Sequence, residues 1–151
     1  MRALIQRVAH SSVSIDGELR SSIGKGLLIL LGIEEADTQE DIDYLVGKIS
    51  RLRIFDDENG VMNLDIQQID GQALVVSQFT LHASTKKGNR PSYIRSAPAS
   101  ISKPLYEKFV ARLETALGKQ VDTGEFGADM KVELLNDGPV TIWIDSRNKE
   151  Y

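Results

Sequence analysis

The sequence contains no cysteine, and this absence excludes several kinds of site at once. Such a chain has no disulfide, no thiolate nucleophile and no cysteine-based zinc site. The motifs of P-loop, Rossmann and G-x-S-x-G enzymes are also missing. The two histidines, His10 and His82, do not have the spacing of metal ligands. We therefore expect no metal and no cofactor.

Long apolar runs and aromatic residues are scarce as well. The longest apolar run, Leu27 to Leu31, is far too short to cross a bilayer, and the charged N-terminal octet is unlike a signal peptide. These features predict a cytoplasmic protein without a membrane partner. Aromatic residues make up only 6% of the chain, which leaves few platforms for stacking nucleic-acid bases.

The patterns that are present predict one domain, 1–151, of the α+β class. Helical spacing begins after Thr38, which can form a capping box with Asp41, and again near Ser102 with Pro104 in the first turn. Gly118 is expected to end the second helix. We expect two main helices on a mainly antiparallel sheet or barrel-like core. The segments with strand patterns are 2–8, 12–15, 26–33, 73–81, 131–135 and 140–144.

Two short segments indicate turns. Asp16-Gly17 between alternating runs predicts a hairpin, and Asn59-Gly60 predicts another turn. The acidic residues 56–58 before that second turn are compatible with a cation site, but an acidic hairpin tip is the interpretation that we favour.

Charge is unevenly distributed along the chain. The net charge of −4 argues against nucleic-acid binding, yet residues 71–106 contain no acidic residue. Either this segment is a solvated loop, or it forms one basic surface for a local polyanion contact. Its five basic residues are Lys86, Lys87, Arg90, Arg95 and Lys103.

Polar side chains interrupt the apolar strand predicted over 73–81. If the strand continued, Gln78, Thr80 and His82 would share one face, and such polar groups need partners. They either bond to neighbouring strands or form a site. The turn 136–139 is similarly open, either as a plain hairpin connector or as a functional loop.

These two segments carry a family resemblance. Ser77-Gln78-Phe79-Thr80-Leu81 resembles the SQFTL motif of the D-aminoacyl-tRNA deacylases, and residues 136–141 resemble their N-x-G-P-[VF]-T motif. The resemblance covers essentially residues 1–145. Further similar segments are 5–8, 26–32, 53–55, 62–64, 88–93 and 128–130.

The resemblance implies a homodimer in which Gly138-Pro139 of one subunit enters the other subunit's site. The bond between these two residues is then cis, and their carbonyl oxygens face the substrate ammonium group. An L-side chain would clash with the motif, whereas achiral glycyl-tRNA would be accepted. Arg7 is expected to brace the motif, although an ordinary salt bridge on an edge strand is the simpler interpretation.

The implied reaction is hydrolysis of the ester at the acceptor end of D-aminoacyl-tRNA. Backbone N–H groups near Gln78, Phe79 and Thr80 would bind the oxyanion, with Ser77 and Gln78 supporting the segment. Met130 belongs to the implied substrate site. We expect the terminal ribose hydroxyl of the tRNA to help activate water, so that Thr80 positions and does not attack. The residues expected on acceptor-stem phosphates are Lys86, Lys87 and Arg90.

Three alternatives stay open from the sequence. His82 would assist a nucleophilic Thr80 only if a bend shortened the distance of about 7 Å along a strand. A small-molecule esterase would use Thr80 as its nucleophile. A non-catalytic RNA-binding module would use the same basic segment.

Overall fold

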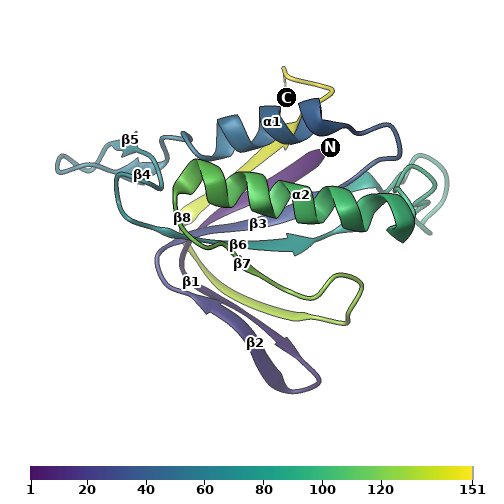
Figure 1. Cartoon of the computed structure of the whole chain (residues 1–151), viewed down its shortest axis with the longest axis horizontal. Helices are drawn as coiled ribbons and strands as arrows, with labels where there is room; N and C mark the ends of the chain where they lie inside the picture. Colours follow the sequence, from purple (N-terminus) through teal and green to yellow (C-terminus); the bar gives the residue numbers. More distant parts are fainter. Residues whose placement is uncertain (151) are drawn as a thin grey trace.

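The computed structural model describes residues 1–150, and Figure 1 shows two helices packed on one face of a curved sheet. The elements in chain order are β1 (Arg2–Ile15), β2 (Glu18–Ile23), β3 (Gly26–Gly32), α1 (Gln39–Ile49), β4 (Phe55–Asp56), β5 (Met62–Leu64), β6 (Gln72–Ser77), the 3₁₀ helix η1 (Phe79–His82), α2 (Ala99–Leu117), β7 (Asp122–Thr123) and β8 (Lys131–Asp145).

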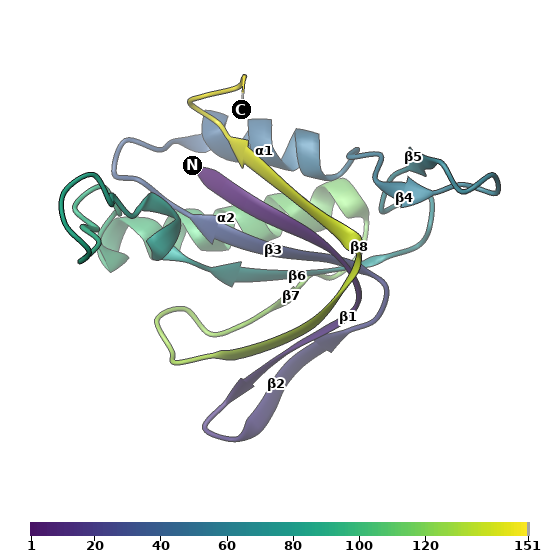
Figure 2. The same ribbon diagram turned by 180° about the vertical axis from the view of Figure 1, so that it is seen from behind.

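The main sheet has the order β2-β1-β3-β6-β7. The strand β8 also pairs with β1, along nearly its whole length from Arg2 to Ser14. The β1 pairings with β2, β3 and β8 are antiparallel, while β3–β6 and β6–β7 are parallel. The α+β class and the mainly antiparallel sheet are thus confirmed. In Figure 2 the far halves of β1 and β8 curl away with β2, which gives the sheet its barrel-like curvature.

The continuous apolar runs of β3 and β6 follow from their position between two cores. Leu27, Ile29 and Val75 face the core under α1 and α2, whereas Leu28 and Leu74 face a second core inside the curled half of the sheet. Side chains alternate across a strand, so a strand covered on both faces must be apolar at every position.

The helix signals were accurate at two ends and wrong at one. Thr38 and Asp41 form the expected capping box at the start of α1, and Gly118 is the C-cap of α2. The start predicted near Ser102 is wrong, because the Pro98 carbonyl already accepts bonds from the N–H groups of residues 101 and 102. Pro104 therefore lies inside α2, not in its first turn.

Both predicted turns are hairpins. Asp16 and Gly17 have φ of 51° and 79° between β1 and β2. In the β4–β5 hairpin the Asp57 carboxylate accepts bonds from the backbone N–H groups of Asn59 and Val61, and these bonds lower its pKa. Within residues 1–150, no helix is long and apolar enough to span a membrane.

Three predicted strands have other boundaries. The strand expected to reach Leu81 ends at Ser77, and η1 follows. The two strands expected around the turn 136–139 form one long strand, β8, because β1 pairs with both halves of it. The register shift between Gln6 and Val8, which pair with Thr141 and Asn136, accommodates residues 137–140 as a bulge.

Candidate active site

The SQFTL segment leaves the sheet at the end of β6 and turns into η1. Gly32, the last residue of β3, makes this turn possible by close approach. A Cβ atom at Gly32 would lie 2.9 Å from Leu81 Cβ and 3.0 Å from the Gln78 carbonyl oxygen. Only glycine therefore lets η1 pack directly over the end of β3.

A cavity of about 290 Å³ opens beside this turn. Four of the predicted site residues line it, namely Ser77, Gln78, Phe79 and Met130. The structure thus brings together residues that are 50 positions apart in sequence. Its remaining wall is mostly apolar, formed by Leu31, Ile33, Val76, Ala97, Ser102, Phe126, Gly127, Ala128, Asp129 and Val132.

The backbone donors at this turn differ from the expected set. The Gln78 N–H donates to the Leu31 carbonyl at 2.8 Å, so it is occupied and the prediction that included it is wrong. The N–H groups of Phe79 and Thr80 begin η1 and have no hydrogen-bond acceptor within residues 1–150. Two adjacent donors are consequently free beside the cavity.

The side chains at the turn offer no evident general base. Gln78 Nε2 donates to the Thr80 hydroxyl oxygen, which fixes both side chains. Asp129 is the one carboxylate in the cavity wall, but its side chain is 85% exposed and pairs with Lys131 at 3.2 Å. A nucleophilic Thr80 would need a base to take its proton, so this arrangement favours a positioning role.

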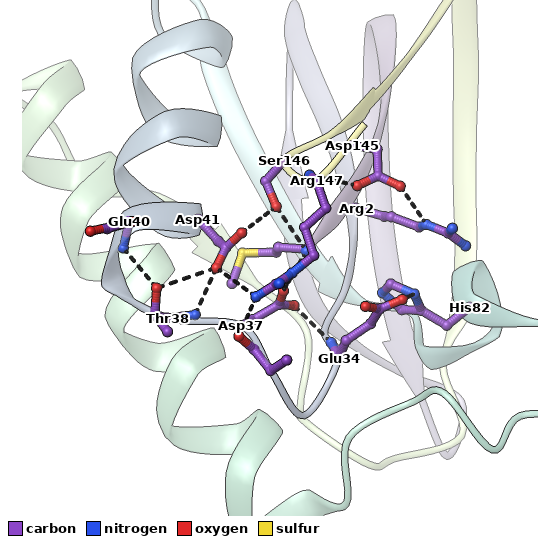
Figure 3. Close-up of polar contacts among 12 residues, drawn as sticks. Arg2, Glu34, Asp37, Thr38, Glu40, Asp41, His82, Asp145, Ser146 and Arg147 are labelled. Carbon is purple, nitrogen blue, oxygen red and sulfur yellow. Dashed lines mark hydrogen bonds and ion pairs between the residues drawn. The ribbon is translucent and has the colours of Figure 1, made fainter. Parts of the chain in front are cut away.

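His82 does not share a strand face with Thr80, as the extended-strand interpretation required. Both residues lie in η1, where residues two apart point in different directions. Figure 3 shows the His82 imidazole beside Glu34, whose Oε1 lies 2.9 Å from Nδ1. The side chain is buried, and this burial lowers its pKa.

Gly138 and Pro139 lie in the bulge of β8, and the peptide bond between them is cis. Both residues are exposed. Arg7 braces the bulge, because its Nε donates to the Asp137 carbonyl within the bulge at 2.7 Å. The Arg7 side chain is itself held by a bond from Nη1 to the Ile54 carbonyl, also at 2.7 Å. Arg7 is only 7% exposed, so bracing describes it better than a surface salt bridge.

Asn136 closes the bulge with its side chain. Its Oδ1 accepts a bond from the Val140 N–H at 2.8 Å, and its Nδ2 donates to the Val140 carbonyl at 3.2 Å. Gly138 has φ of 148°, and a Cβ there would lie 2.7 Å from Val140 Cγ2 and 3.1 Å from Arg7 Nη2. The bulge thus has a defined shape that leaves no room for a larger residue at 138.

The two motifs are far apart within one chain. Through β1 and β3, Asn136 is in register with Gln72 at the start of β6, whereas the cavity begins at Ser77. Five strand residues span about 17 Å. Figures 1 and 2 show the bulge of β8 at the end of the sheet opposite to the arrowhead of β6.

The basic segment forms a loop after η1, and Tyr93 directly after this loop packs edge-on against Phe79 of the cavity wall, with 5.1 Å between ring centroids. Ser84 and Ser92 exchange backbone hydrogen bonds at 2.8 and 2.9 Å and close this loop. Its tip carries Lys86, Lys87 and Arg90, all exposed. The other two basic residues lie elsewhere, since Arg95 pairs with Glu34 and Lys103 belongs to α2.

A family model described as D-Tyr-tRNA(Tyr) deacylase matches residues 4–145. The chain belongs to this family. It is 69% identical over 150 residues to a D-aminoacyl-tRNA deacylase of Bacteroides fragilis (strain YCH46), with 99% of this chain and 100% of the relative covered. A relative of the same description from Chromobacterium violaceum is 62% identical, with the same coverage.

Two solved structures have the same fold. One, titled c-Myc DNA Unwinding Element Binding Protein, is 38% identical with a TM-score of 0.90, and 96% of this chain and 98% of that one are covered. The other, titled a probable eukaryotic D-amino acid tRNA deacylase, has a TM-score of 0.82 over 95% of this chain and 97% of that one. At 16% identity, the second shows the fold alone.

Sequence reasoning missed part of the cavity wall. Phe126 and Ser102 line the cavity, although neither belongs to a motif. The Phe126 ring packs against Tyr106, whose buried hydroxyl donates to the Val75 carbonyl at 2.7 Å. In the sequence, the only sign of this part of the wall is Phe126 itself, an aromatic residue shortly after Gly124. A single aromatic residue does not indicate a site.

Proposed function

We propose that this protein hydrolyses the ester bond of D-aminoacyl-tRNA and releases the free D-amino acid and tRNA. The observation that carries this proposal is the cavity at Ser77 to Phe79 with two free backbone donors beside it. Membership of the D-Tyr-tRNA(Tyr) deacylase family over residues 4–145 supports the same reaction. We place the reaction in the cytoplasm, where aminoacyl-tRNA is used in translation.

The reaction requires a water molecule to attack the ester carbonyl carbon. The carbonyl oxygen becomes an oxyanion, which the N–H groups of Phe79 and Thr80 bind, and each such donor is typically worth about 3–4 kcal/mol. The tetrahedral intermediate then collapses, the bond to the terminal ribose oxygen breaks, and that oxygen takes a proton. Because the cavity offers no clear base, we assign activation of water to the neighbouring ribose hydroxyl of the substrate.

Selection by chirality is assigned to Gly138 and Pro139 of a second copy of the chain. The bulge is exposed and rigidly braced by Arg7, yet it lies about 17 Å from its own chain's cavity along the sheet. A homodimer supplies the missing contact, with each bulge inserted into the partner's cavity. Backbone carbonyls that bind the substrate ammonium group serve many D-amino acids and leave no room for an L-side chain.

Two further features of the substrate follow from this arrangement. Glycine has no side chain to clash with the bulge, so we expect slow hydrolysis of glycyl-tRNA. The exposed Lys86, Lys87 and Arg90 lie in one loop beside the cavity and are assigned to phosphates of the acceptor stem. Phosphate contacts add affinity without sequence preference, which suits an enzyme that acts on many tRNAs.

One assay separates the proposed function from its rivals. The purified chain is incubated with D-tyrosyl-tRNA, L-tyrosyl-tRNA and a simple aryl ester. We expect hydrolysis of D-tyrosyl-tRNA alone. Cleavage of the aryl ester would indicate a small-molecule esterase, and binding of tRNA without cleavage would indicate a non-catalytic RNA-binding module. Either result would contradict the proposal.

A further inference from the structure

His82 is a buried polar residue that the proposed chemistry does not use. Its side chain is 1% exposed, and Glu34 Oε1 lies 2.9 Å from its Nδ1. The geometry is nevertheless poor: within residues 1–150, neither imidazole nitrogen has a well-formed hydrogen bond. Burying a polar ring without good bonds is costly, and an apolar residue would avoid that cost.

His82 is the last residue of η1, and its ring lies against the end of β3. Its Cδ2 atom would lie 3.1 Å from a Cβ at Gly32, so the ring fills the space directly beside the end of β3. Arg2 Nη1 donates to the neighbouring Leu81 carbonyl at 2.9 Å. The C-terminal end of η1 is thus attached to both β1 and β3.

Glu34 links this end of η1 to the segment after the basic loop. Its carboxylate pairs with Arg95, and its backbone forms a bridge with Ser96. The Ser96 hydroxyl in turn donates to the Phe79 carbonyl at 2.9 Å. The contacts of His82 and Glu34 therefore reach the first residue of η1, where the free N–H groups begin.

We propose that His82 is a positioning residue: with Glu34 it fixes the orientation of η1, and so of the Phe79 and Thr80 donors. The inference rests on the proposed hydrolysis at this turn. His82 touches neither the cavity nor Thr80 in the structure and acts through the backbone of η1. A neutral imidazole with Nδ1 beside the Glu34 carboxylate fits the arrangement, because a protonated ring would place a second charge in this buried space.

The charges around the ring agree with a neutral imidazole at pH 7. Burial lowers the pKa of His82, the Gly32 backbone and Glu34 raise it, and Arg2 and the Met1 amine lower it. Arg95 on Glu34 and Asp145 on Arg2 complete the surrounding charges, most of which Figure 3 shows. The ring therefore becomes protonated only at a pH below about 6.5, which is the ordinary pKa of histidine. The positive charge formed there should disturb the orientation of η1.

The test uses two His82 variants and one matched control. His82→Asn retains a donor close to the Nδ1 position but does not titrate, whereas His82→Leu fills the space without a donor. His10→Asn is the control, because His10 is exposed and is the other histidine of the chain. Deacylation of D-tyrosyl-tRNA is measured from pH 5 to 8 and corrected for spontaneous ester hydrolysis.

We expect His82→Leu to lower kcat about tenfold with little change in KM, and His82→Asn to retain at least a third of kcat at pH 7.5. The ratio of wild-type to His82→Asn activity should fall as the pH drops below 6. In the His10→Asn background, NMR of the single remaining imidazole should show a pKa below 6.5. Thermal unfolding measured in parallel separates loss of orientation from loss of folded protein.

Three results would overturn the inference while leaving the proposed function intact. These are full kcat in folded His82→Leu, identical pH profiles for wild type and His82→Asn, and a His82 pKa at or above 6.5. Absence of D-tyrosyl-tRNA hydrolysis by the wild-type protein would instead contradict the proposed function, and with it this inference.

Discussion

At one end of the sheet, Ser77 to Phe79 line a cavity of about 290 Å³, whereas at the other end Gly138 and Pro139 are exposed on the bulge of β8. The first region has its own walls and free donors but no clear means of distinguishing D- from L-amino acids. The second has a rigid backbone shape, braced by Arg7, but no cavity within reach.

In the proposed function, each of the two regions supplies one part of a site that a second copy of the chain completes. Each region is ordered by its own local contacts, so neither needs the other in order to fold. Because a two-fold dimer repeats both contacts, one pairing of bulge and cavity would complete two sites.

The largest effect is expected from Gly138→Ala. The new Cβ would meet Val140 and Arg7 at a backbone φ of 148°, and strain of about 1–3 kcal/mol corresponds to a loss of about 5- to 160-fold in deacylation of D-tyrosyl-tRNA. Gly17→Ala is the matched control, because Gly17 also has positive φ but no atom lies near its Cβ position. Equal effects of the two substitutions would remove the specific role of the bulge.

Mixing subunits then tests whether bulge and cavity act across the dimer. A Gly138→Ala chain is refolded with a chain in which Gln78 and Thr80 are both alanine. Half of the dimers are mixed, and each mixed dimer has one intact site, so about a quarter of the wild-type activity should return. No recovery, with mixed dimers shown to be present, would mean that both regions act within one chain.

The next effect concerns the brace behind the bulge. Arg7→Lys keeps the charge but loses the planar fork that bonds the carbonyls of Ile54 and Asp137. Leaving one buried carbonyl unpaired costs about 1–3 kcal/mol, and we expect activity on D-tyrosyl-tRNA to fall about tenfold, with weaker rejection of L-tyrosyl-tRNA. Unchanged D/L selectivity would show that Arg7 contributes to folding alone.

A smaller effect, on stability, is expected at Tyr106, which packs against Phe126 of the cavity wall. Burial raises the pKa of Tyr106 to about 12, against about 10 when unfolded, so its contribution to stability is present below pH 10 and is lost as the pH rises toward 12. Tyr106→Phe should cost about 1 kcal/mol at pH 7 through the lost bond to Val75, and should weaken the alkaline loss. Urea unfolding at pH 7 and 10.5 measures both, and parallel pH profiles would refute the assignment.

The smallest effect is expected from the basic loop. Single alanine substitutions of Lys86, Lys87 and Arg90 should each weaken tRNA binding a few-fold and lower the slope of log K against log salt by about one. The rate at saturating tRNA should not change. Lys108→Ala on α2 is the control for net charge, and a salt slope unaffected by the loop substitutions would make the loop merely solvated.

The sequence predicted the local elements whose causes lie within a few residues. Thr38 with Asp41, Asp16 with Gly17, and Gly118 are signals of this kind, and all three features are present. It also located the two motifs, and the predicted site residues include four of the fourteen residues that line the cavity. The errors concern the end of β6, the start of α2 and the continuity of β8, because long-range pairing with β1 and close approach to Gly32 override local patterns.

The α+β class, the family resemblance and the candidate site residues could be predicted from the sequence, since hydrophobic period, turn residues and motifs are local properties of the chain. Only the tertiary structure decided which backbone donors are free, that Phe126 and Ser102 join the cavity, and that His82 packs beside Glu34 away from Thr80. Those facts depend on contacts between strands and helices far apart in the chain. The physical reason is that burial and hydrogen-bond partners are properties of the packed molecule, and no local pattern specifies them.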